Sequence, residues 1–489
     1  MPKGGRSRAR RGCLTGLVVV LVLLLAGGVA VYRFDALDRW WPKGPPDPRV
    51  EPAAVAPPEG LDLPAPSPAA TVAPAEDPDP ETRLLPGKVR AAIANALKDR
   101  DLGRHVVVDV ETAAGTGPAY HYGTPHTFTP ASTTKLLTSV AALQALGPDA
   151  TFDTVVRQGA GDRIVLVGGG DPNLASRPVP ADQKDEVYPP RADVRTLAKQ
   201  VAASLREQGR TRVRVGYDDT LFTGPEVNPR WEDSYIPDGV VAPITSLWVD
   251  EGHDPSGYGR VADPAQVATR AFADALERQG IQVRGPLRPA PARPDAPVLG
   301  RVTSAPLSQI VERLLDVSSN EAAEVVARHV GLAVEQDGSF QGAVRGVRSV
   351  LAGLGVPVEG SRWYDGSGLS RDNRLTGDLL LEVLRVASAD EHPRLRAAIT
   401  GMPIAGFTGS LTGRFAEGDP AGLGRIRAKT GTLIEGGVHG LAGYVTDATG
   451  APLLFVVVAD KVKYERTLGA RDAVDEIAAE IAACACTTR

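Results

Sequence analysis

Three short polar motifs constrain this chain more than any other feature of its sequence. They are Ser132-Thr133-Thr134-Lys135, Ser318-Ser319-Asn320 and Lys429-Thr430-Gly431, and each occurs once. Long stretches of chain separate them, so folding must bring them together if they serve one chemical purpose. A fold that uses all three needs a cleft shared by distant parts of the sequence.

The first motif places a serine and a lysine three residues apart at a predicted helix start. Thr129 is the expected N-cap and Pro130 the first-turn residue of a helix that ends at Gly147. Residues three apart project from one face of a helix. A serine hydroxyl becomes a nucleophile when a base takes its proton, and a lysine of lowered pKa can do this whereas arginine cannot. Free N–H groups in the first turn would also favour negative charge near Ser132.

The other two motifs carry groups that suit an amide substrate with a carboxylate. Ser318 and Asn320 flank one residue at a predicted helix start. There Ser318 could relay a proton towards a leaving amine, and Asn320 could hold Lys135 and the substrate amide. Lys429 precedes Thr430-Gly431-Thr432 on a predicted edge strand. A cation beside hydroxyl groups suits a carboxylate, and glycine lets substrate backbone approach closely.

Each motif alone has a simpler explanation. Serine and asparagine are common helix caps, and a serine three residues before a lysine arises by chance in a long chain. Two observations favour a joint role. The motifs stand in one order, and only 10 of the 54 basic residues are lysines, two of which occupy these motifs. Coincidence is therefore a poor explanation.

The N-terminal part carries export signals. Residues 1–12 are basic, residues 13–32 contain an uncharged apolar run about long enough to span a bilayer, and residues 33–83 are rich in proline. Positive charge stays inside, so the rest of the chain is expected on the outer face of the cytoplasmic membrane. A cleaved signal peptide with a site near 28–30 is the alternative. The Pro-rich segment is expected to be an extended spacer or a disordered linker.

Composition narrows the remaining functions. The net charge of −5 predicts no nucleic-acid partner. The seven histidines are scattered and the three cysteines have no zinc spacing, so no metal or cofactor is predicted. Cys484 and Cys486 lie in a C-terminal tail that is expected to fray, and no disulfide is expected to crosslink the folded body.

Hydrophobic periodicity predicts an alternation of helices and strands from about residue 84. The other helices are expected over 86–100, 192–208, 265–279, 307–315, 321–330 and 467–483. Strands are expected over 105–111, 121–122, 163–167, 213–217 and 298–302, with an antiparallel hairpin of 440–445 and 453–459. The glycine run 168–170 lacks the lysine and the spacing of a nucleotide-binding loop.

With these motifs in this order, the chain resembles the class C low-molecular-mass penicillin-binding proteins, which are D-alanyl-D-alanine carboxypeptidases/endopeptidases. The resemblance covers about residues 84–480. Further stretches that resemble the family are Gly169-Gly170-Asp171-Pro172, Tyr217-Asp218-Asp219, Phe222-Thr223-Gly224-Pro225, the segment from Ser318 to Glu324, and Asp365-Gly366-Ser367-Gly368-Leu369-Ser370-Arg371.

The resemblance implies a role for each motif residue. Ser132 would be acylated, Lys135 would be the base, and Ser318 and Asn320 would complete the proton network. Lys429 and Thr430 would bind the terminal carboxylate, with Gly431 and Thr432 beside it. The backbone N–H groups of Ser132 and Thr432 would form the oxyanion hole. Asp171 and the Asp218–Asp219 pair are expected to be structural caps.

The implied fold is α/β (α+β): a transpeptidase-like catalytic domain with an antiparallel sheet flanked by helices. It is expected from residues 84–157 and 302–489, with a smaller α/β domain inserted at 158–301. The insert is short for this family, so one domain, or two with the second much reduced, is expected. Ser319 stands where Asp or Asn is commoner, and its side chain is expected to be secondary.

The sequence thus predicts a serine-type D-Ala-D-Ala carboxypeptidase/endopeptidase that acts on peptidoglycan peptides and is acylated by β-lactams. A serine β-lactamase on the same fold and a catalytically silent wall-binding or sensor protein are the alternatives. The balance of the two peptidase activities, the preferred stem peptide, the oligomeric state and the fate of the N-terminal helix stay open.

Overall fold

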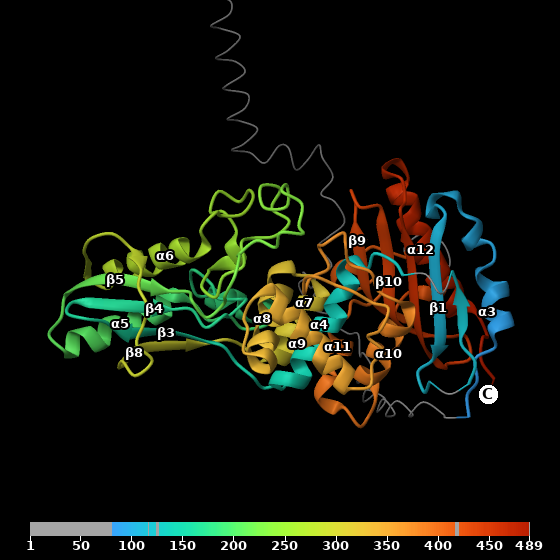
Figure 1. The fold of residues 1–489 in the computed structure, drawn as a ribbon, viewed down its shortest axis with the longest axis horizontal. Coiled ribbons are helices and arrows are strands. Elements are labelled where there is room, and N and C mark those ends of the chain that lie inside the picture. Colours follow the sequence, from blue (N-terminus) through green and yellow to red (C-terminus); the bar gives the residue numbers. More distant parts are fainter. Residues whose placement is uncertain (1–80, 116, 124–126, 416–419, 489) are drawn as a thin grey trace, which may run out of the picture. The chain divides into compact units, whose positions relative to one another are not determined.

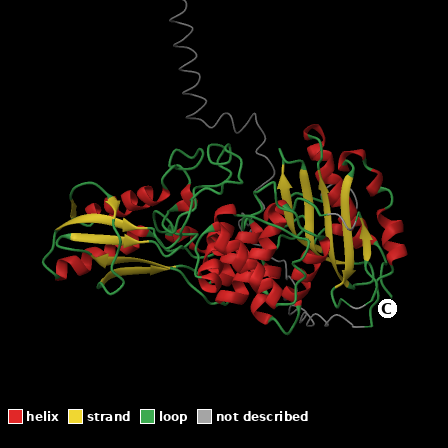
Figure 2. Cartoon of the chain, in the orientation of Figure 1, coloured by secondary structure: helices red, strands yellow, loops and turns green. Residues whose placement is uncertain are grey.

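The computed structural model describes residues 81–115, 117–123, 127–415 and 420–488. The expected membrane segment and nearly all of the Pro-rich segment lie outside these residues. In the part of the chain that is described, no helix is both long and apolar enough to cross a membrane. The described strands gather in two sheets with helices beside each (Figure 2).

The first sheet has five antiparallel strands in the order β2-β1-β11-β10-β9. They are β1 (His105–Thr112), β2 (Tyr120–Tyr122), β9 (Ile426–Leu433), β10 (Val438–Thr446) and β11 (Pro452–Asp460). The expected hairpin is β10 with β11, and β9 is an edge strand as predicted.

Side chains alternate between the two faces of this sheet, so each strand serves two cores. Val108 and Val457 pack on the side of α3 (Pro86–Ile93) and α12 (Thr467–Ala483). Val107 and Val456 pack on the side of α4 (Thr134–Leu146) and α10 (Gly377–Ser388). Figure 1 shows α10 and α12 beside the strands. The sheet is therefore covered by helices on both faces.

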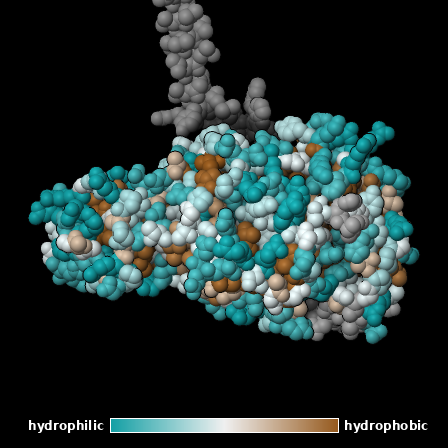
Figure 3. Space-filling view, in the orientation of Figure 1, coloured by the Kyte–Doolittle hydropathy of each residue, from teal (hydrophilic) through white to brown (hydrophobic). Residues whose placement is uncertain are grey.

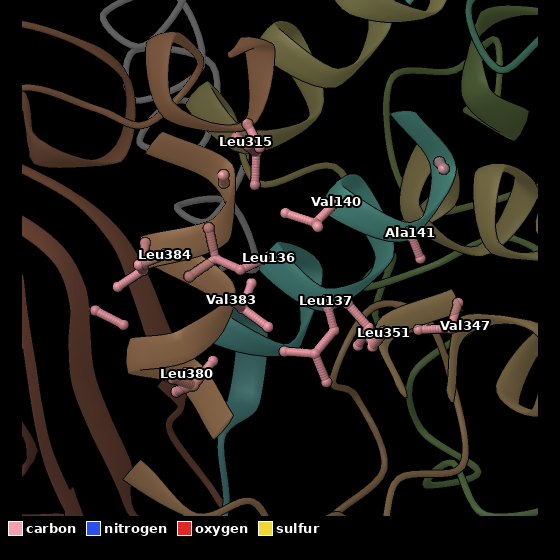
Figure 4. Close-up of a cluster of buried hydrophobic side chains, with 14 of the residues drawn as sticks. Leu136, Leu137, Val140, Ala141, Leu315, Val347, Leu351, Leu380, Val383 and Leu384 are labelled. Atoms are coloured by element: carbon pink, nitrogen blue, oxygen red, sulfur yellow. The ribbon is translucent and has the colours of Figure 1, made fainter. Parts of the chain in front are cut away.

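Helix α4 is the centre of the larger core. Its residues from Thr134 to Leu143 are all buried. Around it pack α7 (Leu307–Asp316), α8 (Asn320–Glu335), α9 (Phe340–Gly353) and α10. Figure 4 shows Leu136, Leu137 and Val140 among side chains of α7, α9 and α10. The helix that carries Lys135 is thus held on several sides.

The second sheet is mixed and has the order β6-β5-β4-β3-β8, with β7 paired to β5. Its strands are β3 (Asp153–Gln158), β4 (Arg163–Val167), β5 (Arg212–Asp218), β6 (Gln282–Val283), β7 (Arg288–Pro289) and β8 (Val298–Thr303). Helices α5 (Val194–Glu207) and α6 (Pro264–Arg278) share its buried core. Strand β3 was not predicted, and it belongs to this sheet although all but its last residue precede the expected insert at 158–301. The division into domains stays a prediction.

One local expectation is wrong, and two helices were missed. The first helix ends at Ile93 rather than at residue 100, and two 3₁₀ turns, Ala96–Lys98 and Arg100–Leu102, follow it. Helices α9 and α10 were not predicted at all.

On the face of the molecule shown in Figure 3, hydrophobic residues form small separate areas among hydrophilic ones.

The C-terminal tail is ordered, contrary to expectation. Cys484 and Cys486 form a disulfide, and Cys486 is fully buried. The backbone N–H of Leu85 donates to the carbonyl of Cys486 (2.7 Å), and that of Thr488 donates to the carbonyl of Arg83 (2.9 Å). Backbone partners that lie four hundred residues away explain why the sequence pattern missed this contact.

Candidate active site

Ser132 lies in a short 3₁₀ turn, Ala131–Thr133, directly before α4. Thr129 is not the N-cap that was predicted. Its backbone N–H donates to the Asp460 carboxylate (2.8 Å), and its hydroxyl accepts from Arg374 (3.0 Å). These bonds tie the turn to the end of β11 and hold the serine at a fixed place against the sheet.

Lys135 joins the first motif to the second. Its Nζ donates to Ser132 Oγ (2.9 Å), to Asn320 Oδ1 (2.7 Å) and to the carbonyl of Ser367 (2.8 Å). Burial lowers the pKa of Lys135 to about 8, against the opposing effect of Glu324 and two other carboxyl groups. With that pKa, roughly a tenth of the side chain is unprotonated at pH 7. A neutral lysine in contact with a serine hydroxyl has the geometry of a general base.

Asn320 is oriented by bonds on both sides of its amide. Its Nδ2 donates to the carbonyl of Val240 (2.8 Å), so its Oδ1 faces Lys135. Ser319 caps α8, because its hydroxyl accepts from the N–H of Ala322 (3.1 Å). The secondary role expected for Ser319 is thus a helix cap.

Ser318 links α7 to α8 with a left-handed backbone conformation, φ 58°. This conformation is uncommon for a residue other than glycine. The described hydrogen bonds include none from the Ser318 hydroxyl, so its predicted contact with a proton network is not present among the described residues. The strained junction fixes the backbone direction between the two helices.

Lys429 projects from the edge strand β9 and is fully buried. Its Nζ donates to the carbonyl (3.2 Å) and the hydroxyl (3.3 Å) of Thr430, whose hydroxyl is 2.8 Å from that of Ser410. Burial and the nearby charge of Lys135 hold the pKa of Lys429 well below its usual range, while Asp316 opposes the shift. The positive charge of Lys135 thus helps to lower the pKa of Lys429.

Gly431 permits β9 to lie against the serine turn. A Cβ at this position would lie 2.7 Å from the carbonyl oxygen of Pro130, closer than real Cβ atoms come. Any side chain would push the strand away from Ser132. This close approach is the physical reason for glycine in the third motif.

Ser132, Asn320 and Thr432 line one cavity of about 300 Å³, which we call the serine cavity. Tyr235, Arg371 and Ile434 are also among its lining residues. Thr432 directly follows the third motif, whereas Lys429 and Thr430 are not among these lining residues. The close approach of Gly431 to Pro130 is what brings the third motif to the serine turn.

Sequence reasoning assigned no role to the loop that supports Lys135. Glu324 accepts from the backbone N–H groups of Gly366 (3.0 Å) and Ser367 (2.7 Å). Asp365 accepts from the N–H of Gly368 (3.1 Å) and that of Ser370 (2.6 Å). These bonds aim the Ser367 carbonyl at Lys135. The Asp-Gly-Ser-Gly stretch was the available signal, because it pairs a carboxylate with turn-forming residues.

Burial raises the pKa of Glu324 to about 7, and the negative charge of the neighbouring Asp365 raises it further.

Asp171 and Asp218 act as local caps. Asp171 accepts from the N–H of Asn173 (2.8 Å), and Asp218 accepts from those of Thr220 (3.0 Å) and Ala292 (2.7 Å). Within the described ranges, no three His, Cys, Asp or Glu side chains are grouped to hold a metal ion.

This fold, with a serine hydroxyl in contact with a buried lysine, defines the class: α/β proteins of the penicillin-binding and serine β-lactamase type. The model of the D-Ala-D-Ala carboxypeptidase 3 (S13) family matches residues 89–256 and 254–481. The chain is 36% identical to carboxypeptidase DacB of Mycolicibacterium smegmatis, over 96% of both proteins. It is 31% identical to a D-alanyl-D-alanine carboxypeptidase of Actinomadura sp., over 77% of this chain and 81% of that protein.

A solved structure has the same fold. Penicillin binding protein 4 (dacB) from Haemophilus influenzae matches 79% of this chain and 99% of its own, with a TM-score of 0.64 and 20% identity. The fold class predicted from the sequence is confirmed.

The chain belongs to the D-Ala-D-Ala carboxypeptidase 3 (S13) family. It is a serine-type D-Ala-D-Ala carboxypeptidase of the penicillin-binding type, as predicted. Since this family acts on the cell wall, the enzyme works outside the cytoplasm.

Proposed function

We propose that Ser132 is the residue acylated by the D-Ala-D-Ala peptide and that Lys135 is its general base. The single observation that carries this proposal is the 2.9 Å contact between Lys135 Nζ and Ser132 Oγ, at a lysine whose pKa is lowered to about 8. The contacts of the same ammonium group with Asn320 and Ser367 restrict its position.

In the acylation step, Lys135 takes the hydroxyl proton while Ser132 Oγ bonds to the carbonyl carbon of the scissile amide. The C–N bond then breaks, and the leaving amine receives the proton that Lys135 took. Ser318 makes no described hydrogen bond to Lys135 or Asn320, so its relay role requires the bound substrate to bridge to its hydroxyl. The backbone N–H groups of Ser132 and Thr432 stabilise the oxyanion. Lys429 and Thr430 hold the terminal carboxylate, and Gly431 leaves room for peptide backbone.

Water completes the cycle. It attacks the acyl carbon of the ester, its proton passes to Lys135, and Ser132 leaves as a hydroxyl. A β-lactam enters the same path: Ser132 opens the lactam ring, and the amine stays attached to the acyl group and hinders the attack of water. One relative, penicillin binding protein 4 of Haemophilus influenzae, has been solved in complex with a β-lactam.

A labelled penicillin tests this proposal. We expect a long-lived covalent adduct on a peptide that contains Ser132, detected by mass spectrometry, and loss of both the adduct and D-alanine release in Ser132→Ala. Rapid turnover of the drug would support the β-lactamase alternative. D-Alanine release that survives in Ser132→Ala would remove this serine from the mechanism.

We further propose that residues 13–32 hold the enzyme at the outer face of the membrane and that residues 33–83 space it from the bilayer. The uncharged apolar run after a basic segment supports this. We also propose the division into a catalytic domain (84–157 and 302–489) and an insert (158–301). A separate buried core supports it, although that core also includes Val156 and Val302 from just outside the insert.

A further inference from the structure

A hydroxyl group from outside the three motifs lies against the third one. Ser410 belongs to the short 3₁₀ helix Gly409–Leu411, 20 residues before Thr430 in the sequence. Its Oγ is 2.8 Å from Thr430 Oγ1. In the proposed mechanism, Thr430 and Lys429 hold the terminal carboxylate of the substrate, and Ser410 has no task.

The neighbours of Ser410 in the chain fix its place beside β9. Leu411 is fully buried in the core on the α12 side of the sheet. Gly409 has φ 50°, and a Cβ there would lie 2.2 Å from Oδ1 of Asp316, the last residue of α7. The segment is thus packed on one side into the core and on the other against α7. The Ser410 hydroxyl therefore stays within reach of Thr430.

The hydrogen bonds around Thr430 decide where its hydroxyl hydrogen can point. A hydroxyl group has one hydrogen to donate and two lone pairs that accept. Lys429 Nζ donates to Thr430 Oγ1 (3.3 Å), which occupies one lone pair. If Thr430 donated to Ser410, no hydrogen would remain for a carboxylate, which only accepts. A carboxylate bound to Thr430 therefore requires that Ser410 donate to Thr430.

The hydrogen of Ser410 is available for this bond. Among the described hydrogen bonds, the Ser410 hydroxyl has no partner other than Thr430. Thr430 is 7% exposed, so water competes little for its second lone pair. In a line of hydroxyl groups, each hydrogen bond polarises the next one and strengthens it. An ionised carboxylate at the end of the line gains most, because hydrogen bonds to charged groups are stronger than neutral ones.

We propose that Ser410 is a positioning residue for the terminal carboxylate: its hydroxyl donates to Thr430 and directs the hydrogen of Thr430 to the substrate. The proposal rests on the proposed function, in which Lys429 and Thr430 hold this carboxylate. It extends the carboxylate site beyond the third motif to the segment 409–411. It concerns every substrate that carries this carboxylate, the peptide and penicillin alike, and it changes no bond-making step.

A pair of substrates separates this role from a purely structural one. Benzylpenicillin carries the carboxylate, and its methyl ester does not. We expect Ser410→Ala to lower the second-order rate constant of Ser132 acylation by penicillin about fivefold or more, and to change that for the ester by less than about twofold. Ser410→Thr keeps a hydroxyl and should stay within about twofold of the unchanged enzyme with both compounds. Mass spectrometry of the intact protein over time measures these rate constants.

Thr412→Ala is the matched control, because it removes an exposed hydroxyl just after the same 3₁₀ helix. That hydroxyl donates to the carbonyl of Phe407 (3.4 Å), and its loss should leave both rate constants unchanged. Thr430→Ala tests the path of the effect. If Ser410 acts through Thr430, addition of Ser410→Ala to Thr430→Ala should lower the rate constant for penicillin by less than about twofold further.

Three results would each overturn the role of Ser410: an unchanged rate constant in Ser410→Ala, equal losses with penicillin and its ester, or losses that add fully in the double variant. The proposed function fails in a different way. If the unchanged enzyme forms no adduct on Ser132, the motifs lack that function, and Ser410 has no carboxylate site to serve. Normal acylation of the unchanged enzyme together with any of the three results refutes the role of Ser410 alone.

Discussion

The ammonium group of Lys135 donates to the Ser132 hydroxyl, the Asn320 amide oxygen and the Ser367 carbonyl. When the group loses a proton, it therefore loses one of these three bonds. In the proposed mechanism acylation needs the neutral amine, and burial lowers the pKa of Lys135 to about 8. We therefore expect the rate constant of penicillin acylation to rise about tenfold per pH unit below pH 8 and to level off above it. Stopped-flow measurement of acylation between pH 6 and 9 checks this.

The matched variants are Lys135→Arg and Lys199→Arg. Arginine keeps the positive charge but does not deprotonate, so Lys135→Arg should lower the acylation rate by about 10³-fold or more. Lys199 is exposed on α5 and its replacement should have no effect. A flat pH profile in the unchanged enzyme would exclude Lys135 as the titrating base.

Asp171 is a buried carboxyl group whose ionisation opposes folding. Burial raises its pKa to about 7, and its Oδ2 has no hydrogen-bond partner. An unfolded carboxyl ionises above its ordinary pKa near 4, so the folded state loses relative stability as pH rises towards 7. Asp171→Asn removes this dependence.

The difference in unfolding temperature between Asp171→Asn and the unchanged protein should therefore shift in favour of the variant from pH 5 to pH 8. The corresponding free energy is on the order of a few kcal/mol. Asp218→Asn serves as a comparison, because that carboxylate accepts several bonds at a more exposed turn. A difference that does not change with pH would show that Asp171 ionises freely in the folded state.

At the scale of elements, the loop 365–371 packs closely against the serine turn that precedes α4. Gly368 has φ 89°, and a Cβ there would lie 1.8 Å from the carbonyl oxygen of Ala131. Gly368→Ala should displace the loop, weaken the Lys135–Ser367 contact, and lower both acylation and stability, the latter by about 2 kcal/mol or more.

Gly355→Ala separates the clash from backbone strain. Gly355 has a similar φ of 81° but no heavy atom within 4 Å of an added Cβ. Its replacement should cost about 1 kcal/mol and leave acylation unchanged. Urea unfolding measures the change in stability, and penicillin labelling measures acylation. Equal effects of the two substitutions would mean that the loop does not support the site.

The motifs, the edge strand β9 and the hairpin β10–β11 were predictable because each depends on local pattern and on chemistry that few residue types can provide. The start of α4 was not, because Thr129 is used by Asp460 rather than by the helix. Helices α9 and α10 carry good apolar faces but no motif directed attention to them. Glu324 and Ser367 were missed for another reason: their roles exist only through contacts between segments that are distant in the chain.

At the scale of the whole molecule, the tail holds the two ends of the folded part together. The Asp447 carboxylate accepts from the N–H of Cys486 (3.1 Å) and the hydroxyl of Thr487 (3.0 Å). Deletion of residues 484–489 removes these bonds and those to Arg83 and Leu85. We expect the unfolding temperature to fall by about 5 °C in calorimetry. Deletion of residue 489 alone is the control, and an equal temperature in both proteins would contradict the role of the tail.

Leu84 and Thr487 form an isolated β-bridge, so the first and last parts of the described chain lie side by side. If the N-terminal segment tethers the enzyme to the bilayer, mechanical load enters the fold at this bridge and passes first into the last residues rather than into the helices around Ser132. A protein fused to the C-terminus would emerge beside the tether. The same proximity makes the molecule a natural subject for circular permutation, with new ends opened in a surface loop and the old ones joined by a short linker.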